Sequence, residues 1–164
     1  MSTTVDAPAT RLEQRELRAW RGMLRVHAAL SKALDAQLEA THGLALSSYE
    51  VLMFVGDAEG ERMRMCDLAE SILLSRSGLT RLVDRLEREG LVMRASCSSD
   101  ARGAYACLTP AGRQKLDAAR ATHLAGVRAM FLSHLSPAEQ DVLGDLWTRI
   151  APDEPGAVSS CCKT

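Results

Sequence analysis

The sequence predicts a mainly α-helical fold with a small β wing. Three observations lead to this prediction. Two short helical patterns joined by a tight turn begin near Met65, a two-stranded hairpin follows them directly, and long amphipathic helical patterns lie on either side. This order of elements is that of a winged helix-turn-helix core flanked by long N-terminal and C-terminal helices.

The second helix of the short pair has the clearest pattern. Its apolar residues have the spacing that buries one face of a helix, and they are Leu79, Leu82, Val83 and Leu86. Ser75 is a suitable N-cap and Gly90 a suitable left-handed stop, so the helix is predicted from about Arg76 to Glu89. Its polar residues fall on the opposite face, which is left for a partner.

The N-terminal part of the chain predicts two more helices. One is expected from about Leu12 to Thr41, with Gly43 ending it. The other is expected to begin at Ser47, whose hydroxyl could cap the helix while Glu50 reaches back in a capping box.

Two further start signals follow the hairpin. Thr109-Pro110 and Ser136-Pro137 each place a capping hydroxyl before a proline that suits the first helical position. The helices at both ends present more apolar surface than the module between them can cover, so a symmetric dimer is expected. Two equivalent helices about 34 Å apart could then read a pseudo-palindrome in double-stranded DNA.

A single domain is expected over residues 11–151. Within it, the dimerisation helices are expected at 11–42 and 109–151, and the winged helix-turn-helix module is expected at 46–108. Residues 1–10 and 152–164 show no periodicity, and they are expected to form a disordered tail and a flexible tail.

The net charge of −1 argues at first against a nucleic-acid partner, because phosphate neutralisation favours an excess of cations. Its distribution points the other way, since residues 62–102 hold eight Arg against six Asp or Glu. We therefore expect specific binding with weak non-specific affinity.

The open face of the second helix supplies the candidates for the major groove, which are Arg76, Ser77, Thr80, Arg81 and Arg85. A guanidinium fork matches guanine O6 and N7, which favours Arg76 and Arg81 for base edges. Arg85 with Glu89, and Asp84 with Arg88, could instead be solvated i,i+4 ion pairs.

The hairpin tip and the strands near it supply further DNA candidates. Arg102 could enter a narrow minor groove, and Asp100 could hold the turn that presents it. The phosphate candidates are Ser75, Arg94, Arg62 and Arg64. Arg94 could also meet Asp100, and Arg62 and Arg64 could equally be solvated surface residues.

A set of motifs between Met65 and Gly112 resembles the MarR family of bacterial transcription regulators. The motifs are Leu74-Ser75, Leu79-Thr80-Arg81-Leu82-Val83-Asp84-Arg85-Leu86-Glu87, Gly90-Leu91-Val92-x-Arg94, Asp100-x-Arg102 and Leu108-Thr109-x-x-Gly112. The resemblance implies a homodimer with a recognition helix in the major groove and a wing arginine in the minor groove. Gly103 departs from the pattern, because many relatives carry a second arginine there.

The resemblance also implies a regulator that leaves DNA when a small, often aromatic or phenolic, molecule enters a cleft beside the dimer helices. In the first helix the apolar stripe through Trp20 is interrupted by His27 and Ser31, which could line such a cleft. A core histidine or an interface hydrogen bond is the alternative. We expect a sequence-specific regulator of transcription, a repressor relieved by an effector.

A thiol-based redox regulator is the alternative function, with Cys97 or Cys66 as the reactive thiol. The five cysteines form no CxxC or paired Cys/His pattern, so no metal and no cofactor are expected. The sequence also has no GxSxG, HExxH, P-loop or Rossmann fingerprint, so no enzyme is expected. No leader and no membrane span is recognised, and the chain is expected to be cytoplasmic.

Overall fold

The structure is a computed structural model that describes residues 11–72, 75–97 and 100–151. Of residues 97 and 100–103 it describes the backbone alone. The elements in chain order are α1 (Gln14–His42), α2 (Leu46–Asp57), η1 (Glu59–Glu61), β1 (Arg62–Arg64), α3 (Met65–Ser71), α4 (Arg76–Arg88), β2 (Val92–Cys97), β3 (Asp100–Leu108), α5 (Pro110–Met130), η2 (Leu132–His134) and α6 (Pro137–Ile150). The predicted fold class is confirmed, while the predicted tails at 1–10 and 152–164 lie outside the described residues.

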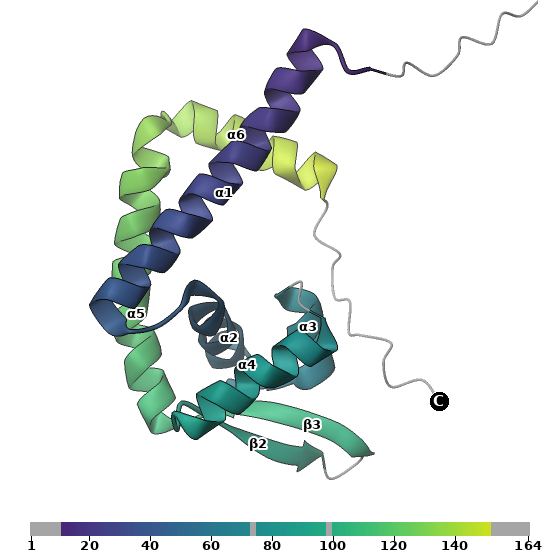
Figure 1. Cartoon of the computed structure of the whole chain (residues 1–164), viewed down its shortest axis with the longest axis vertical. Coiled ribbons are helices and arrows are strands. Elements are labelled where there is room, and N and C mark those ends of the chain that lie inside the picture. The colour runs from purple at the N-terminus through teal and green to yellow at the C-terminus, as the bar shows by residue number, and fades with distance from the viewer. Residues whose placement is uncertain (1–10, 73–74, 98–99, 152–164) are drawn as a thin grey trace, which may run out of the picture.

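The helices and the sheet are arranged in two parts (Figure 1). One part is a lobe made of α2, α3, α4 and the sheet, and α1, α5 and α6 extend from it toward the opposite end of the molecule. α5 packs against both α1 and α2, so it connects the lobe to the extended helices. A displacement of α5 would therefore also disturb its packing against α2 in the lobe.

The short helix pair forms as the sequence predicts. Ser75 caps α4, since its Oγ accepts a hydrogen bond from the Gly78 amide at 3.1 Å. Beyond its last turn Gly90 has a φ of 73°, the left-handed conformation expected there. All four residues of the predicted apolar face are buried: Leu79, Leu82, Val83 and Leu86. They join Leu68 of α3 and residues of α2 in one core.

The start of α2 was predicted wrongly. The helix begins at Leu46 with Ala45 as its N-cap and has no side-chain cap, so Ser47 and Glu50 do not form a capping box there. The Leu46 amide instead donates to Asp35 Oδ1 of α1 at 2.8 Å. A tertiary contact thus satisfies one of the free N–H groups at the start of α2.

The sheet has the strand order β1-β3-β2 and is antiparallel throughout. β2 and β3 are the predicted hairpin. β1 was not predicted, because a strand of three residues is too short to show an alternating pattern. Its register places Arg62 opposite Cys107 and Arg64 opposite Tyr105 on β3. The two arginines therefore lie on one face of the sheet, beside Tyr105.

The two later start signals are confirmed. Thr109 caps α5 by accepting the Gly112 amide at 3.0 Å, and Ser136 with Glu139 forms a capping box at the start of α6. Thr109 Oγ1 also donates to the Gly90 carbonyl at 2.6 Å. This bond ties the first turn of α5 to the segment that joins α4 to the hairpin.

Candidate nucleic-acid interface

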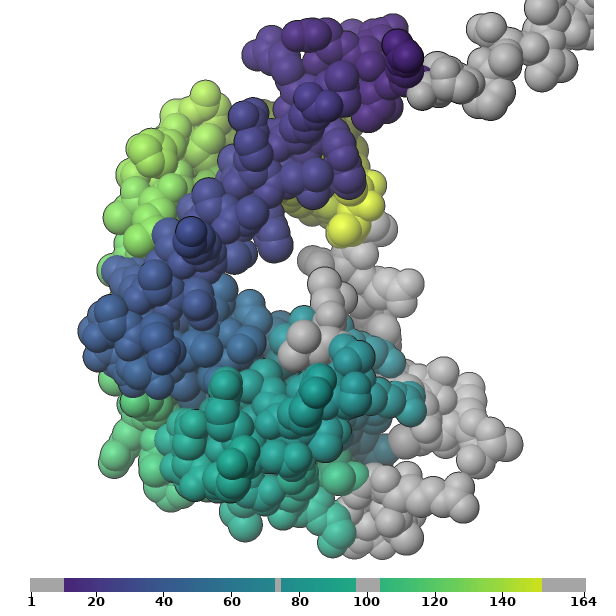
Figure 2. Space-filling view, viewed as in Figure 1, coloured from purple at the N-terminus to yellow at the C-terminus, as the bar shows by residue number. Residues whose placement is uncertain are grey.

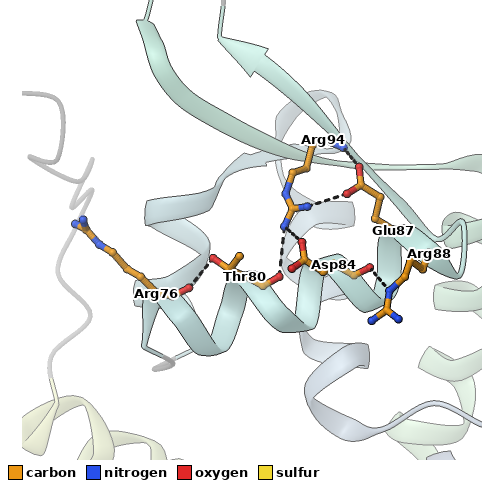
Figure 3. A network of polar contacts seen from close by, with 6 residues as sticks. All are labelled: Arg76, Thr80, Asp84, Glu87, Arg88 and Arg94. Carbon is orange, nitrogen blue, oxygen red and sulfur yellow. Dashed lines mark hydrogen bonds and ion pairs between the residues drawn. The ribbon is translucent and has the colours of Figure 1, made fainter.

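α4 turns its polar face outward, away from the buried face that holds it in the lobe. Ser77, Thr80 and Arg81 are exposed on this polar face. Among the described residues, none forms a hydrogen bond or an ion pair with the Arg81 guanidinium. Thr80 Oγ1 donates to the Arg76 carbonyl at 2.8 Å, which leaves the hydroxyl oxygen able to accept a further bond (Figure 3). Arg81 is thus the side chain of this face that is most available to a partner.

Arg85 has contacts within the lobe. Its Nη2 donates to Ser48 Oγ of α2 at 2.6 Å, and its Nε lies 4.0 Å from Glu89 Oε1. The i,i+4 alternative for Arg85 is therefore present in the structure, together with a bond to a buried hydroxyl. A contact between Arg85 and DNA stays a prediction.

Arg94 of β2 reaches across to α4 (Figure 3). Its Nη1 lies 2.8 Å from Glu87 Oε2, and its Nη2 lies 2.5 Å from Asp84 Oδ1. The Arg94 amide also donates to Glu87 Oε1 at 3.0 Å. The sequence did not predict Asp84 and Glu87 as partners of Arg94, because only the tertiary fold brings β2 beside α4.

The second i,i+4 alternative is wrong as an ion pair. Asp84 gives its carboxylate to Arg94, and the Arg88 Nε donates to the Asp84 backbone carbonyl at 3.2 Å. Helical spacing places Arg88 one turn after Asp84, but the Asp84 carboxylate pairs with the Arg94 guanidinium of β2.

The two arginines of β1 are organised by an aromatic ring. The guanidinium carbons of Arg62 and Arg64 lie 5.5 Å and 5.6 Å from the centroid of Tyr105. Arg64 Nε also donates to the Tyr105 hydroxyl at 3.1 Å. The sequence did not predict that Tyr105 contacts these two arginines, because only the register of β1 against β3 places it beside them. The predicted phosphate contacts of Arg62 and Arg64 are not tested by this geometry.

Some predicted site residues lie outside what the structure describes. The side chains of Asp100, Arg102 and Cys97 are not described, although their backbone belongs to the hairpin strands. The Cys66 thiol donates to Asp67 Oδ1 at 3.3 Å. A neighbouring carboxylate does not favour the thiolate that oxidants attack, so this contact gives no support to a redox role for Cys66.

The predicted effector residues lie on α1. Trp20 and His27 are exposed and Ser31 is half-buried. Burial raises the pKa of Glu50 on α2, and the charge of His27 partly offsets this rise. The charge of His27 thus acts on Glu50 across the junction of α1 and α2. At the same junction α5 contributes His123, whose ring lies 4.5 Å from that of Tyr49, and burial lowers the pKa of His123.

Two negative findings apply to the described residues alone. None of their helices is both long and apolar enough to cross a membrane. Nor do three or more of their His, Cys, Asp or Glu side chains come together as a metal ion would need.

A helix-turn-helix with exposed arginines on its second helix, followed by a β hairpin, defines a winged helix-turn-helix protein of the DNA-binding class. The model of the MarR family matches residues 42–103. AbsC, a MarR family transcriptional regulator from Streptomyces coelicolor, is 36% identical, with a TM-score of 0.82 over 87% of this chain and 96% of that chain. The chain belongs to the MarR family of DNA-binding transcriptional regulators.

Two further similar proteins agree with this assignment. A second MarR family regulator from Streptomyces coelicolor, solved in complex with DNA, is 32% identical, with a TM-score of 0.83 over 89% of this chain and 91% of that chain. The HTH-type transcriptional repressor YetL of Bacillus subtilis (strain 168) is 29% identical over 74% of this chain and 77% of YetL. These relatives are transcription regulators.

Proposed function

We propose that the chain acts as a homodimer that reads a pseudo-palindromic operator in double-stranded DNA, represses transcription there, and is released by a small-molecule effector. The observation that carries the proposal is the exposed polar face of α4, on which no described residue engages the Arg81 guanidinium. An arginine in this position on a recognition helix can donate two hydrogen bonds to guanine O6 and N7.

The remaining DNA contacts follow from the position of each residue around α4. Arg76, Ser77 and Thr80 share the first turns of α4 with Arg81, so they are proposed for the major groove, with Arg85 at the edge of the same surface. Arg102 is proposed for the minor groove, with Asp100 supporting the hairpin. Ser75, Arg62 and Arg64 are proposed to contact DNA backbone phosphates. The Tyr105 ring would orient the guanidinium groups of Arg62 and Arg64 for these contacts.

The proposed dimer rests on apolar surface at the end of the molecule opposite the lobe. Trp20 and Leu24 of α1 are 52% and 46% exposed, and Trp147 and Ile150 of α6 are 43% and 69% exposed. In the space-filling view the N-terminal half of α1 stands clear of the lobe, so this surface is open to a second copy (Figure 2). Apolar side chains exposed together in this way are typical of a protein interface.

The proposed regulation rests on the junction of α1, α2 and α5. Three buried polar atoms there have no hydrogen-bond partner among the described residues: Gln37 Oε1, Arg120 Nε and His123 Nδ1. A small polar or phenolic molecule that satisfied such atoms could change how α5 holds the lobe. On α1 the candidate residues are His27 and Ser31, while Trp20 lies toward the end of α1 that we propose for the dimer. Repression is proposed by similarity to YetL, and the cytoplasm is proposed because chromosomal DNA lies there.

The test is a titration of the purified chain against a duplex from its own upstream promoter region and a scrambled duplex of equal length, each at two salt concentrations. We expect tighter binding to the promoter duplex and an affinity that falls steeply as salt rises. Sedimentation of the same samples should give two chains per duplex. Equal affinity for both duplexes, or a monomer on the promoter duplex, would refute the proposal.

A matched variant separates dimerisation from folding. Ile150→Glu places a charge on the most exposed apolar side chain of α6, away from the lobe. We expect this variant to sediment as a monomer with an unchanged helical circular dichroism spectrum and to lose affinity for the promoter duplex. A fully dimeric Ile150→Glu chain would remove α6 from the proposed interface.

A further inference from the structure

We propose that Arg94 is a positioning residue, which fixes the wing against the DNA-reading helix and screens two carboxylates of that helix from DNA. The inference rests on the proposed DNA-binding role of α4. It assigns to Arg94 a different task from the phosphate contact that its sequence position predicts.

The first support is the geometry of the contacts (Figure 3). Thr80, Asp84 and Glu87 have the spacing i, i+4, i+7, so they lie along one flank of α4 over two turns. Arg94 Nη2 pairs with Asp84 at 2.5 Å and donates to the Thr80 carbonyl at 3.3 Å. Its Nη1 pairs with Glu87 at 2.8 Å. One planar guanidinium therefore holds three groups along the helix.

The second support is the backbone. The Arg94 amide donates to Glu87 Oε1 at 3.0 Å, while the Arg94 side chain binds Oε2 of the same carboxylate. Glu87 is thus bound by both the main chain and the side chain of one β2 residue. This double contact sets the position of β2 along α4, and β2 continues into the hairpin that carries Arg102.

The third support is charge. α4 carries four arginines and two carboxylates, Asp84 and Glu87, and both carboxylates pair with Arg94. Only 29% of the Arg94 side chain is exposed. If the Arg94 side chain turned to a phosphate, Asp84 and Glu87 would lose their ion pairs on the helix that approaches DNA, and their charges would repel the phosphates. When Arg94 pairs with α4, it neutralises these carboxylates and the repulsion is avoided.

The test is a double-mutant cycle on DNA affinity. The four chains are wild type, Arg94→Ala, Asp84→Asn/Glu87→Gln, and the variant with all three changes. The duplexes are an operator selected from a random pool with the wild-type chain and a scrambled duplex of the same length. We expect Arg94→Ala to weaken operator binding about tenfold in the wild-type background and less than about threefold once both carboxylates are neutral.

Two controls accompany the cycle. Arg88→Ala removes one positive charge from α4, but Arg88 contacts the Asp84 backbone carbonyl and neither carboxylate. Its effect on operator affinity should therefore be the same with charged and with neutral carboxylates. Arg94→Lys keeps the charge but loses the planar fork, so it should bind the operator more weakly than wild type does, whereas a phosphate contact tolerates lysine. Thermal unfolding of each variant identifies any chain that has not folded, and Arg94→Lys then replaces Arg94→Ala in the cycle.

The outcomes are distinct. A loss on Arg94→Ala that is the same in both backgrounds, and the same on operator and scrambled duplexes, would make Arg94 a phosphate ligand and overturn the inference. A loss that disappears with neutral carboxylates and lowers the operator-to-scrambled ratio would support it. If the wild-type chain selects no sequence from the pool, the proposed function fails, and the positioning role in DNA binding fails with it.

Discussion

Gly112 lies where α5 approaches the base of the wing too closely for a side chain. A Cβ built at Gly112 would lie 2.0 Å from the Leu91 carbonyl oxygen and 2.9 Å from Leu108 Cδ1. Both distances are far below van der Waals contact, and the first involves a backbone atom that cannot rotate away. Gly112→Ala must therefore push the first turn of α5 away from the segment that leads into β2.

The size of the effect follows from three contributions. Overpacking of this kind costs about 1–3 kcal/mol. The displacement also strains the bonds of Thr109 to the Leu91 carbonyl, which are both 3.1 Å long and are worth about 1 kcal/mol together. Alanine regains at most about 1 kcal/mol of helix propensity. The expected loss is about 1–3 kcal/mol of unfolding free energy, or roughly 2–12 °C in Tm for a chain of this length.

The assay is thermal unfolding followed by circular dichroism at one fixed protein concentration, because a dimer's Tm depends on concentration. Gly144→Ala is the matched control for helix propensity, since within one chain a Cβ at Gly144 in α6 meets nothing within 4 Å. We expect it to be neutral or more stable than wild type by about 0.5–1 kcal/mol. A Gly112→Ala chain as stable as wild type would refute the reasoning.

Three further predictions concern DNA binding and pH. Arg81→Ala should weaken operator binding by about 1–3 kcal/mol and relax base preference, measured by titration; equal weakening on scrambled DNA would instead indicate a phosphate contact. Arg102→Ala should weaken A/T-flanked operators most, and a loss independent of flanking sequence would exclude the minor-groove role. Because burial lowers the pKa of His123 from 6.5, the unfolded chain takes up a proton first, so stability should fall as pH drops below about 6.5 and then level off below the folded pKa. His123→Gln should flatten this fall in pH-dependent unfolding, and an unchanged profile would show that other groups cause it.

Local sequence determined most of the secondary structure. The caps at Ser75, Thr109 and Ser136 form as predicted, because each hydroxyl accepts a hydrogen bond from a backbone amide only three residues further along the chain. The buried face of α4 also follows directly from its spacing, since a regular helix fixes which residues share a face. The same regularity placed Arg81 on the open face.

The failures occurred where a partner is distant in sequence. The α2 start is served by Asp35, and Asp84 binds Arg94 in place of its helical neighbour Arg88. Helical periodicity gives neighbours three or four residues apart, but it does not give the strand that packs beside a helix. The sequence by itself therefore determined most of the helices, the caps at Ser75, Thr109 and Ser136, and the place of Arg81 on the open face of α4. Only the tertiary structure decided which groups the arginines contact, because the packing of β2 on α4 and the pairing of β1 with β3 beside Tyr105 set their partners.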